Sequence, residues 1–178
     1  MTEQIILAGF GGQGVLLAGQ IIAYAGMNEG KNVSWLPSYG PEMRGGTANC
    51  NVILSDTPVG SPIVQHPNVL MVMNNPSLDK YEDTVAPGGK IFVDSTLISR
   101  KVRRTDVEAY YIPATGLAGE MGMPTLANML LLGALIEKTG CVSFDSVAPA
   151  LHKVIPARKA DLFDVNMKAI EAGKDYQG

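Results

Sequence analysis

The sequence predicts a three-layer α/β domain built on a mostly parallel sheet. Three observations predict it. The chain opens as a strand, a glycine turn and a helix. A continuous apolar run, Val69–Met73, is typical of a strand buried on both faces. Predicted strands then alternate with predicted helices to the end of the chain. Since a domain takes about 100–200 residues, we expect a single domain over residues 1–178.

Along the opening residues, the pattern of apolar side chains changes from a continuous run to a helical repeat. Gln4–Ala8 is a short apolar run that enters a glycine cluster. From Val15 to Ala25 the apolar residues recur at helical spacing, and Gly30 stands where that helix should stop. Val33–Leu36 reads as a second strand.

A loop and an antiparallel hairpin are expected next. Residues 37–46 read PSYGPEMRGG, with no helical or strand period, and their prolines and glycines predict a loop with a defined path. Thr47–Leu54 alternates apolar and polar residues, as half-buried strands do. The turn Asp56–Gly60 then suggests an antiparallel return.

The second half supplies two more strands and most of the helices. Asn75-Pro76 reads as a helix N-cap followed by proline, starting a short helix to about Val85. Strands are expected at Lys90–Asp94 and Ala109–Ile112. Further helices are expected at Leu126–Lys138 before Gly140, from a Ser143 cap through Val154, and at about Ala160–Ala172 before Gly173.

Composition excludes several classes of protein. A net charge of −3 argues against general nucleic-acid binding. The two cysteines, Cys50 and Cys141, are too few for an iron–sulfur cluster and lack the spacing of a zinc site, so we expect no metal site. The longest apolar stretch, Leu126–Ile136, is far shorter than the roughly 20 residues of a membrane span. With no signal peptide apparent at Met1, we expect a soluble, cytoplasmic protein without membrane contact.

Charge is unevenly distributed. The first 79 residues hold two basic and five acidic residues. Either this half is a buried parallel sheet, or part of it faces another protein, because interface cores are depleted in charge. Both interpretations stay open.

The glycine cluster has three interpretations. Gly9, Gly11 and Gly14 match G-x-G-x-x-G after a strand and before a helix, a Rossmann-like turn. Glycines allow close approach, and a helix N-terminus suits a phosphate. The glycines could instead serve strand–helix packing or the approach of a partner's backbone. An NAD site would need an acidic residue about 20 positions after the glycines, and the sequence has none there. Val15-Leu16 stand where a P-loop needs lysine and serine or threonine.

Three motifs together resemble a known family. They are GFGGQGV at Gly9–Val15, SYGPEMRGGTANC at Ser38–Cys50 and NNPSLDKYE at Asn74–Glu82. They resemble the gamma subunit of the 2-oxoacid:ferredoxin oxidoreductases, nearest to the 2-oxoglutarate and branched-chain 2-oxoacid branches. The region around Asn128 and Gly133 also fits, so the resemblance covers nearly the whole chain.

The resemblance implies a role inside a larger enzyme. Such complexes oxidatively decarboxylate a 2-oxoacid, here 2-oxoglutarate by preference, to an acyl-coenzyme A and reduce ferredoxin. Thiamine diphosphate with Mg²⁺ and the iron–sulfur clusters lie on the alpha, beta and delta-type subunits. The gamma component packs against these partners and is implicated in coenzyme A access. We therefore expect no catalytic residue here, neither His66 nor His152, and an isolated chain that is inactive. A stand-alone nucleotide- or NAD-binding protein is the alternative, and a homodimer of the isolated chain stays open.

Two groups of residues are the candidate contacts. For a phosphate, coenzyme A or the thiamine-holding subunit they are Gly9, Gly11, Gly12, Gln13 and Gly14. For a partner or an anion they are Tyr39, Pro41, Glu42, Arg44, Gly45 and Gly46. Arg44 could instead pair with Glu42, and Tyr39 could be a lid on the core.

One basic run belongs to neither group of candidate contacts. Arg100–Arg104 carries four positive charges in five positions. It reads either as a solvated loop or as a docking point. The docked group would be the 3′-phosphate of coenzyme A or an acidic partner such as ferredoxin.

Overall fold

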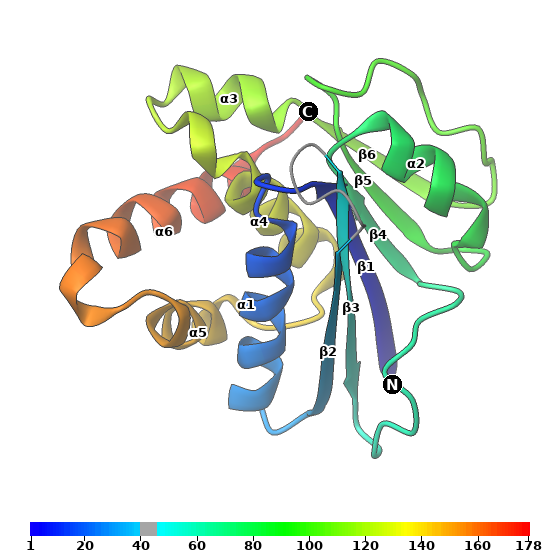
Figure 1. Ribbon diagram of the computed structural model, residues 1–178, viewed down its shortest axis with the longest axis horizontal. Helices are drawn as coiled ribbons and strands as arrows, with labels where there is room; N and C mark the ends of the chain where they lie inside the picture. Colours follow the sequence, from blue (N-terminus) through cyan, green and yellow to red (C-terminus); the bar gives the residue numbers. More distant parts are fainter. Residues whose placement is uncertain (40–45) are drawn as a thin grey trace.

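The computed structural model of the protein describes residues 1–39 and 46–178, and these form a six-stranded sheet in the order β2-β3-β1-β4-β5-β6 (Figure 1). The strands are β1 (Thr2–Phe10), β2 (Asn32–Tyr39), β3 (Thr47–Ser55), β4 (Val69–Val72), β5 (Lys90–Asp94) and β6 (Glu108–Ile112). Parallel pairing joins β1, β4, β5 and β6, whereas β3 runs antiparallel to both β1 and β2. The α/β class, the mostly parallel sheet and the presence of an antiparallel hairpin are confirmed, and the hairpin pairs β2 with β3. The antiparallel return expected at the turn Asp56–Gly60 is wrong, because the next strand, β4, pairs with β1 and β5 and not with β3.

Helices cover both faces of the sheet. They are α1 (Val15–Asn28), α2 (Asn75–Tyr81), α3 (Ala114–Glu120), α4 (Ala127–Thr139), α5 (Val147–Val154) and α6 (Ala160–Asp175). In Figure 1, α1, α4, α5 and α6 lie on one side of the sheet and α2 on the other.

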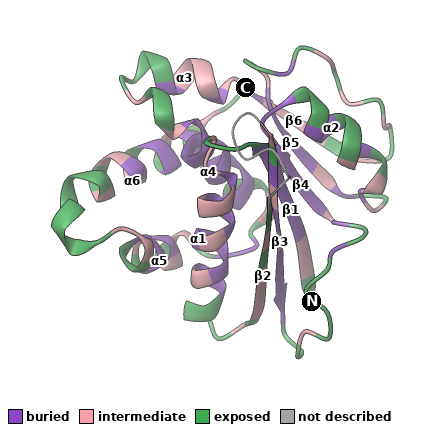
Figure 2. Cartoon of the chain, in the orientation of Figure 1, coloured by how far each residue is buried: buried purple, intermediate pink, exposed green. Residues whose placement is uncertain are grey.

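Each face of the sheet has its own core. Ile5 and Leu7 of β1 pack toward α1 and α4, and the alternate residues Ile6 and Ala8 pack toward α2. Successive strand residues point to opposite faces, so one apolar run supplies both cores. Figure 2 shows the buried residues concentrated in the sheet and α4. The sheet and the helices on its two faces therefore form the three predicted layers.

Helix α3 was not predicted, because its start signal is distant in sequence. The segment ATGLAGE is short and holds two glycines, which weaken a helix pattern. The buried carboxylate of Asp94, at the end of β5, accepts hydrogen bonds from the Thr115 hydroxyl (2.6 Å) and backbone N–H (3.3 Å). A side chain about twenty positions earlier thus holds the first turn.

Two helix starts differ from the predictions. The N-cap of α2 is Asn74, not Asn75, because the Asn74 Oδ1 accepts the Ser77 N–H at 2.8 Å. Ser143 caps a short 3-10 turn, Phe144–Ser146, and α5 begins only at Val147.

Two further boundaries were also wrong. Gly173 lies inside α6, which continues to Asp175, rather than after its end. Strand β2 extends through Pro37 to Tyr39, although residues from 37 on were expected to form a loop. Proline is tolerated there because β2 is an edge strand, where no second neighbour needs its N–H.

The position of Gly173 reflects a close helix crossing. A Cβ atom on Gly173 would overlap the backbone carbonyl of Leu130 in α4. Reciprocally, a Cβ atom on Gly133 of α4 would overlap the carbonyl of Ile170 in α6. The two helices therefore touch backbone to backbone, which only glycine permits on each side.

Candidate functional site

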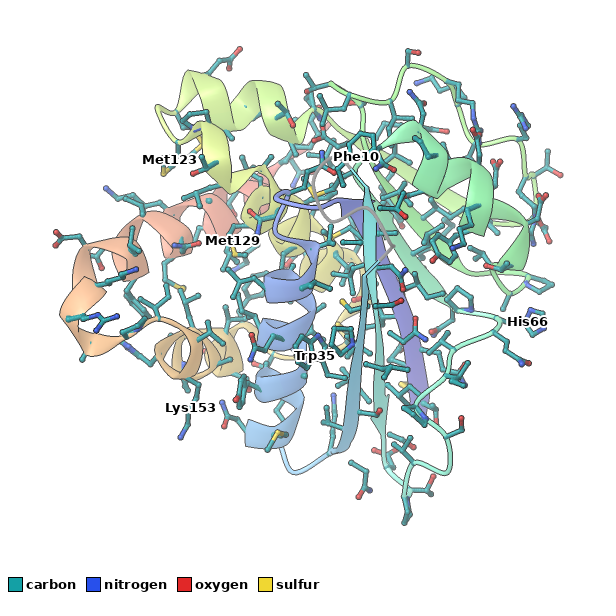
Figure 3. All side chains as sticks on the ribbon, viewed as in Figure 1. Phe10, Trp35, His66, Met123, Met129 and Lys153 are labelled. Carbon is teal, nitrogen blue, oxygen red and sulfur yellow. The ribbon has the colours of Figure 1, made fainter. Side chains whose placement is uncertain are left out.

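The glycine turn lies where the sheet reverses its winding. From β1 the chain leaves through α1 across one face to β2, and from β4 it leaves through α2 across the other face to β5. The carboxyl ends of β1 and β4 are thus the switch point of the sheet, where open α/β folds usually bind ligands. Figure 3 shows Phe10, the last residue of β1, at this edge.

The turn itself is accessible, and two of its glycines are required by conformation. Gly12 and Gly14 have φ angles of 93° and 78°, which residues other than glycine rarely adopt. Gly11 and Gly12 are exposed, and a Cβ atom on Gly12 would meet nothing within 4 Å. Gly14 is the N-cap of α1 and receives no side-chain capping bond.

The side chain of Gln13 makes two hydrogen bonds that hold the turn. Its side-chain Oε1 accepts the Phe10 N–H at 2.6 Å, and its Nε2 donates to the carbonyl of Met73, just after β4, at 3.0 Å. Gly9 is buried in β1, and a Cβ atom there would lie 2.5 Å from the Gln13 Oε1. Gly9 thus lies behind the turn and leaves room for the amide of Gln13.

A residue of α4 holds the other end of the turn. Asn128 is 4% exposed, and its Nδ2 donates to the Gly14 carbonyl at 3.0 Å. Its amide occupies the space that a Cβ atom on Gly14 would need. Sequence reasoning noted Asn128 only as part of the resemblance, because its partner lies 114 positions away.

The electrostatics of the turn come from the backbone. The first N–H groups of α1 have no intrahelical acceptor and carry the positive end of the helix dipole. No acidic side chain in the first turn of α1 neutralises it. A hollow of about 300 Å³ opens beside these groups. Its walls are Phe10, Gly11, Gly12, Gly14, Val15, Leu16, Leu17 and Ala48. This arrangement can bind an anionic group attached to an apolar chain.

The second group of candidate contacts adjoins the same turn. Gly46 accepts the Gly11 N–H through its carbonyl at 2.8 Å, and the backbone of Tyr39 pairs with Ala48. The two motifs therefore meet at one edge of the sheet. Pro41, Glu42, Arg44 and Gly45 lie outside the described residues, so their roles stay predictions.

Part of the charge-poor half forms an uncharged outer surface. Met27 of α1 and Leu36 of β2 are 57% and 37% exposed. A hollow of about 300 Å³ between these elements is lined by Gln20, Ala23, Tyr24, Met27, Val33 and Trp35. Burial in a parallel sheet therefore does not by itself explain the scarcity of charge.

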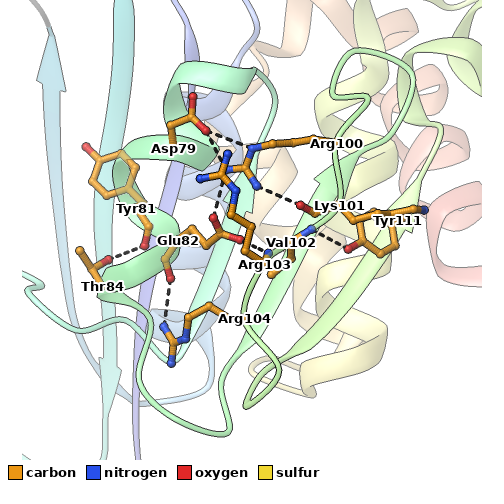
Figure 4. Close-up of polar contacts among 10 residues, drawn as sticks. All are labelled: Asp79, Tyr81, Glu82, Thr84, Arg100, Lys101, Val102, Arg103, Arg104 and Tyr111. Carbon is orange, nitrogen blue, oxygen red and sulfur yellow. Dashed lines mark hydrogen bonds and ion pairs between the residues drawn. The ribbon is translucent and has the colours of Figure 1, made fainter.

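The basic run is held to the protein surface in part: Arg100 and Arg104 are half-buried and paired, whereas Lys101 and Arg103 are exposed (Figure 4). Arg100 donates to Asp79 at 2.7 Å and to Glu82 at 3.0 Å. Glu82 is 2% exposed and also accepts the backbone N–H of Arg103. The expectation of a solvated loop is wrong for Arg100, because a buried carboxylate in the segment after α2 holds it.

Two further charges of this run are also engaged. Arg104 pairs with Asp106 at 2.7 Å, and this hydrogen bond holds the pKa of Asp106 below its usual value. Lys101 lies 4.0 Å from the ring centroid of Tyr111. Within the run, only the side chain of Arg103 is both exposed and without a partner among the described residues. The docking interpretation stays a prediction.

The remaining reactive groups offer no second site. Cys50 and Cys141 are buried free thiols, and burial raises the pKa of Cys50 to about 12, which makes it a poor nucleophile. His66 lies on an outer loop, away from Phe10 (Figure 3), and His152 stacks on Phe163 at 4.0 Å. Within residues 1–39 and 46–178, no three His, Cys, Asp or Glu side chains are grouped as a metal site requires.

Among the helices that the structure describes, none combines the length and the apolar character that a bilayer-crossing helix needs.

Comparison with known sequences identifies relatives along almost the whole chain. The family model for pyruvate ferredoxin/flavodoxin oxidoreductase matches residues 4–176. Ketoisovalerate oxidoreductase subunit VorA of Methanothermobacter thermautotrophicus is 42% identical over 175 residues. The match covers 97% of this chain but 36% of that protein, so this chain spans about a third of it. 2-Oxoglutarate synthase subunit KorC of Methanocaldococcus jannaschii is 40% identical over 159 residues, 88% of this chain and 85% of KorC.

Solved structures agree with the sequence comparison. The gamma subunit of a keto/oxoacid ferredoxin oxidoreductase from Geobacter sulfurreducens superposes with a TM-score of 0.82 at 31% identity. The match covers 96% of this chain and 95% of that one. A 2-oxoglutarate:ferredoxin oxidoreductase from Magnetococcus marinus, with 2-oxoglutarate, coenzyme A and succinyl-CoA bound, gives 0.87 at 26% identity. There the match covers 97% of this chain and 30% of the other.

Proposed function

The chain belongs to the pyruvate ferredoxin/flavodoxin oxidoreductase family, and from that membership we propose that it is the gamma component of a multisubunit 2-oxoacid:ferredoxin oxidoreductase. The observation that carries the proposal is the match to KorC, a subunit of comparable length, over 88% of this chain and 85% of that one. In this proposal residues 1–178 are one gamma-type domain.

The complex would oxidatively decarboxylate a 2-oxoacid, form the acyl-coenzyme A and reduce ferredoxin. We take 2-oxoglutarate as the substrate, because the match to KorC, at 40% identity, covers 85% of that protein, whereas the match to VorA covers only 36%. Thiamine diphosphate, Mg²⁺ and the iron–sulfur clusters would be held by alpha, beta and delta-type partners. The described residues offer no grouped ligands for a cluster, and no step is assigned to this chain through one.

This chain would contribute subunit packing and a coenzyme A contact. The uncharged surface of α1 and β2 supports packing against partners, since interface cores are poor in charge. The hollow beside the glycine turn supports coenzyme A, because the N–H groups of α1 suit a phosphate and the apolar walls suit its chain. The stand-alone NAD-binding alternative is not favoured, since β2 carries no acidic residue.

Co-expression with neighbouring reading frames tests the assembly. We expect this chain to copurify with the thiamine and iron–sulfur subunits through size exclusion. The assembly should reduce a viologen dye with 2-oxoglutarate and coenzyme A, and the isolated chain should not. Dye reduction by the purified chain alone, or its separation from all partners, would refute the proposal.

Gly12→Asp tests the coenzyme A contact. An aspartate at this exposed position would place a negative charge beside the phosphate, so the KM for coenzyme A should rise about tenfold or more. The kcat and the KM for the 2-oxoacid should change little. Gly12→Asn is the matched control, because it has nearly the same shape and tolerance of positive φ without the charge. Equal KM values for the two variants would exclude a coenzyme A phosphate at the turn.

A further inference from the structure

Helix α1 and the neighbouring strand β2 contain no charged residue along their whole length. The sequences Val15–Asn28 and Asn32–Tyr39 hold no Asp, Glu, Lys, Arg or His. Helix α6, on the same side of the sheet, instead carries exposed charges such as Asp161, Asp164 and Lys168. A helix face that meets water usually carries charged or polar residues. The outer face of α1 is therefore better suited to a protein contact than to water.

This uncharged face is accessible. Met27 of α1 is 57% exposed, and Gln20 and Tyr24, on the same side of the helix, are half-buried. These three side chains line the hollow of about 300 Å³ between α1 and β2, and Trp35 of β2 lies in its wall (Figure 3). The surface therefore offers an apolar recess next to the edge of the sheet.

The charges nearest to this surface in sequence are already engaged. Glu29 and Lys31, in the turn between α1 and β2, pair with each other at 3.4 Å. Glu29 also accepts the backbone N–H of Ser143, and Lys31 donates to the carbonyl of Cys141 at 2.6 Å. Neither side chain is left to attract a charged partner to the surface.

The outer edge of β2 offers free backbone groups. β2 is the first strand of the sheet, and among the described residues only β3 pairs with it. In an antiparallel pair, alternate residues direct their N–H and C=O to the partner strand. Proline has no N–H, so Pro37 fits the set that faces away from β3. Val33 and Trp35, at the same parity, then present complete N–H and C=O pairs to the outer edge.

The opposite edge of the sheet is protected by charge. Glu108 of β6 pairs with Lys90 at 3.3 Å, and Lys101 lies over the ring of Tyr111. Charged side chains at an edge discourage the addition of another strand. β2 has no charged side chain of this kind, so it is the edge that can accept a strand.

A second copy of the same chain fits this surface. Contacts between different proteins commonly use complementary charges, and α1 and β2 offer none. In a two-fold contact each patch meets its own copy, so any charge near the axis would face a like charge. A neutral patch meets that requirement. An antiparallel strand can also pair with itself about such an axis, which brings the two α1 helices side by side on one face of the joined sheet.

We propose that the α1–β2 surface joins two copies of this chain, with the two β2 strands paired antiparallel about a two-fold axis at Ser34. In this register Val33 pairs with Trp35 of the other copy, so both complete outward pairs are used and Pro37 is not needed as a donor. The inference rests on the packing role in the proposed function, and it names the partner of that packing.

The mass of the purified full chain tests the pairing. Light scattering at about 100 µM should give twice the mass of one chain. Leu36→Lys puts a charge on the strand edge at a side chain that is 37% exposed, and should raise the dissociation constant of the dimer about tenfold or more. Ile63→Lys is the matched control, because Ile63 is 59% exposed on the loop between β3 and β4. That variant should remain dimeric.

Ser34→Cys tests the position of the axis. Two residues facing each other in a non-hydrogen-bonded pair have Cα atoms about 4.5 Å apart, within the range of a disulfide. Mild oxidation should therefore convert most of this variant into a covalent dimer. Ser61→Cys, on an exposed loop, is the control and should crosslink much more slowly. The natural cysteines Cys50 and Cys141 are buried and do not interfere.

Three results would overturn the inference. They are a monomeric wild-type chain, a dimer that Leu36→Lys weakens no more than Ile63→Lys does, and a Ser34→Cys variant that crosslinks no faster than Ser61→Cys. If a thiamine- or iron–sulfur-holding subunit covers this surface instead, the isolated chain will be monomeric and Leu36→Lys will prevent copurification.

The proposed function is tested separately by copurification with the other subunits. A wild-type chain that copurifies with them but is monomeric in isolation overturns only the pairing of two copies. A chain that pairs with itself but separates from all other subunits overturns only the proposed assembly.

Discussion

Gly133→Ala is expected to lower the free energy of unfolding by about 3 kcal/mol. The new methyl group would overlap the carbonyl of Ile170 and crowd the backbone N of Lys174, and neither atom can rotate away. Helices α4 and α6 would have to separate along their whole contact. Alanine's better helix propensity offsets only about 1 kcal/mol of this strain.

Thermal and urea unfolding of the purified chain measure the effect. For a chain of this length, the expected loss corresponds to a fall in Tm of about 6–12 °C. Gly119→Ala is the control, because Gly119 lies in α3 with nothing within 4 Å of its Cβ position. That variant should be as stable as the wild type or slightly more so. If Gly133→Ala melted with Gly119→Ala, the backbone contact between α4 and α6 would not exist in solution.

Glu82→Ala is expected to cost a similar amount, about 3 kcal/mol. It removes the buried carboxylate that accepts from the Arg100 guanidinium and the Arg103 N–H, and leaves both donors without that acceptor. The segment around residues 100–104 would lose its contacts with the buried Glu82 carboxylate (Figure 4) and keep only the exposed pair with Asp79 and the bonds from Arg104 to the Glu82 and Val85 carbonyls.

The exposed partner of the same arginine supplies the comparison. The Asp79 side chain is 58% exposed and pairs with Arg100 at 2.7 Å. Because solvent screens exposed ion pairs, Asp79→Asn should cost at most about 1 kcal/mol. Urea midpoints of the two variants check the difference. Equal midpoints would show that burial of Glu82 does not set the strength of this cluster.

The sequence predicted the features that depend on neighbouring residues. The turn between β1 and α1, the apolar strand β4 and the stop of α4 at Gly140 all follow from local pattern, and the structure confirms them. The place of the glycine turn at the carboxyl end of β1 follows too, whereas its position at the switch point depends on the strand order, which the sequence did not predict.

Features that join distant residues could not be read from the sequence. Asn128 reaches Gly14 across 114 positions, and Glu82 reaches Arg100 across 18. Asp94, at the end of β5, accepts a hydrogen bond from Thr115 in the first turn of α3. In each case a polar side chain finds its partner only after the chain has folded. Spacing along the sequence carries no signal for such pairs.

The glycine crossing has a consequence for synthesis on the ribosome. Every residue from Ala127 to Ile136 is buried in the finished protein, and α6 closes one side of that helix. A nascent chain that has released α4 but not residues 160–175 therefore leaves the side of α4 that faces α6 exposed. Packing of that side must wait for translation of α6, and until then it can make non-native contacts.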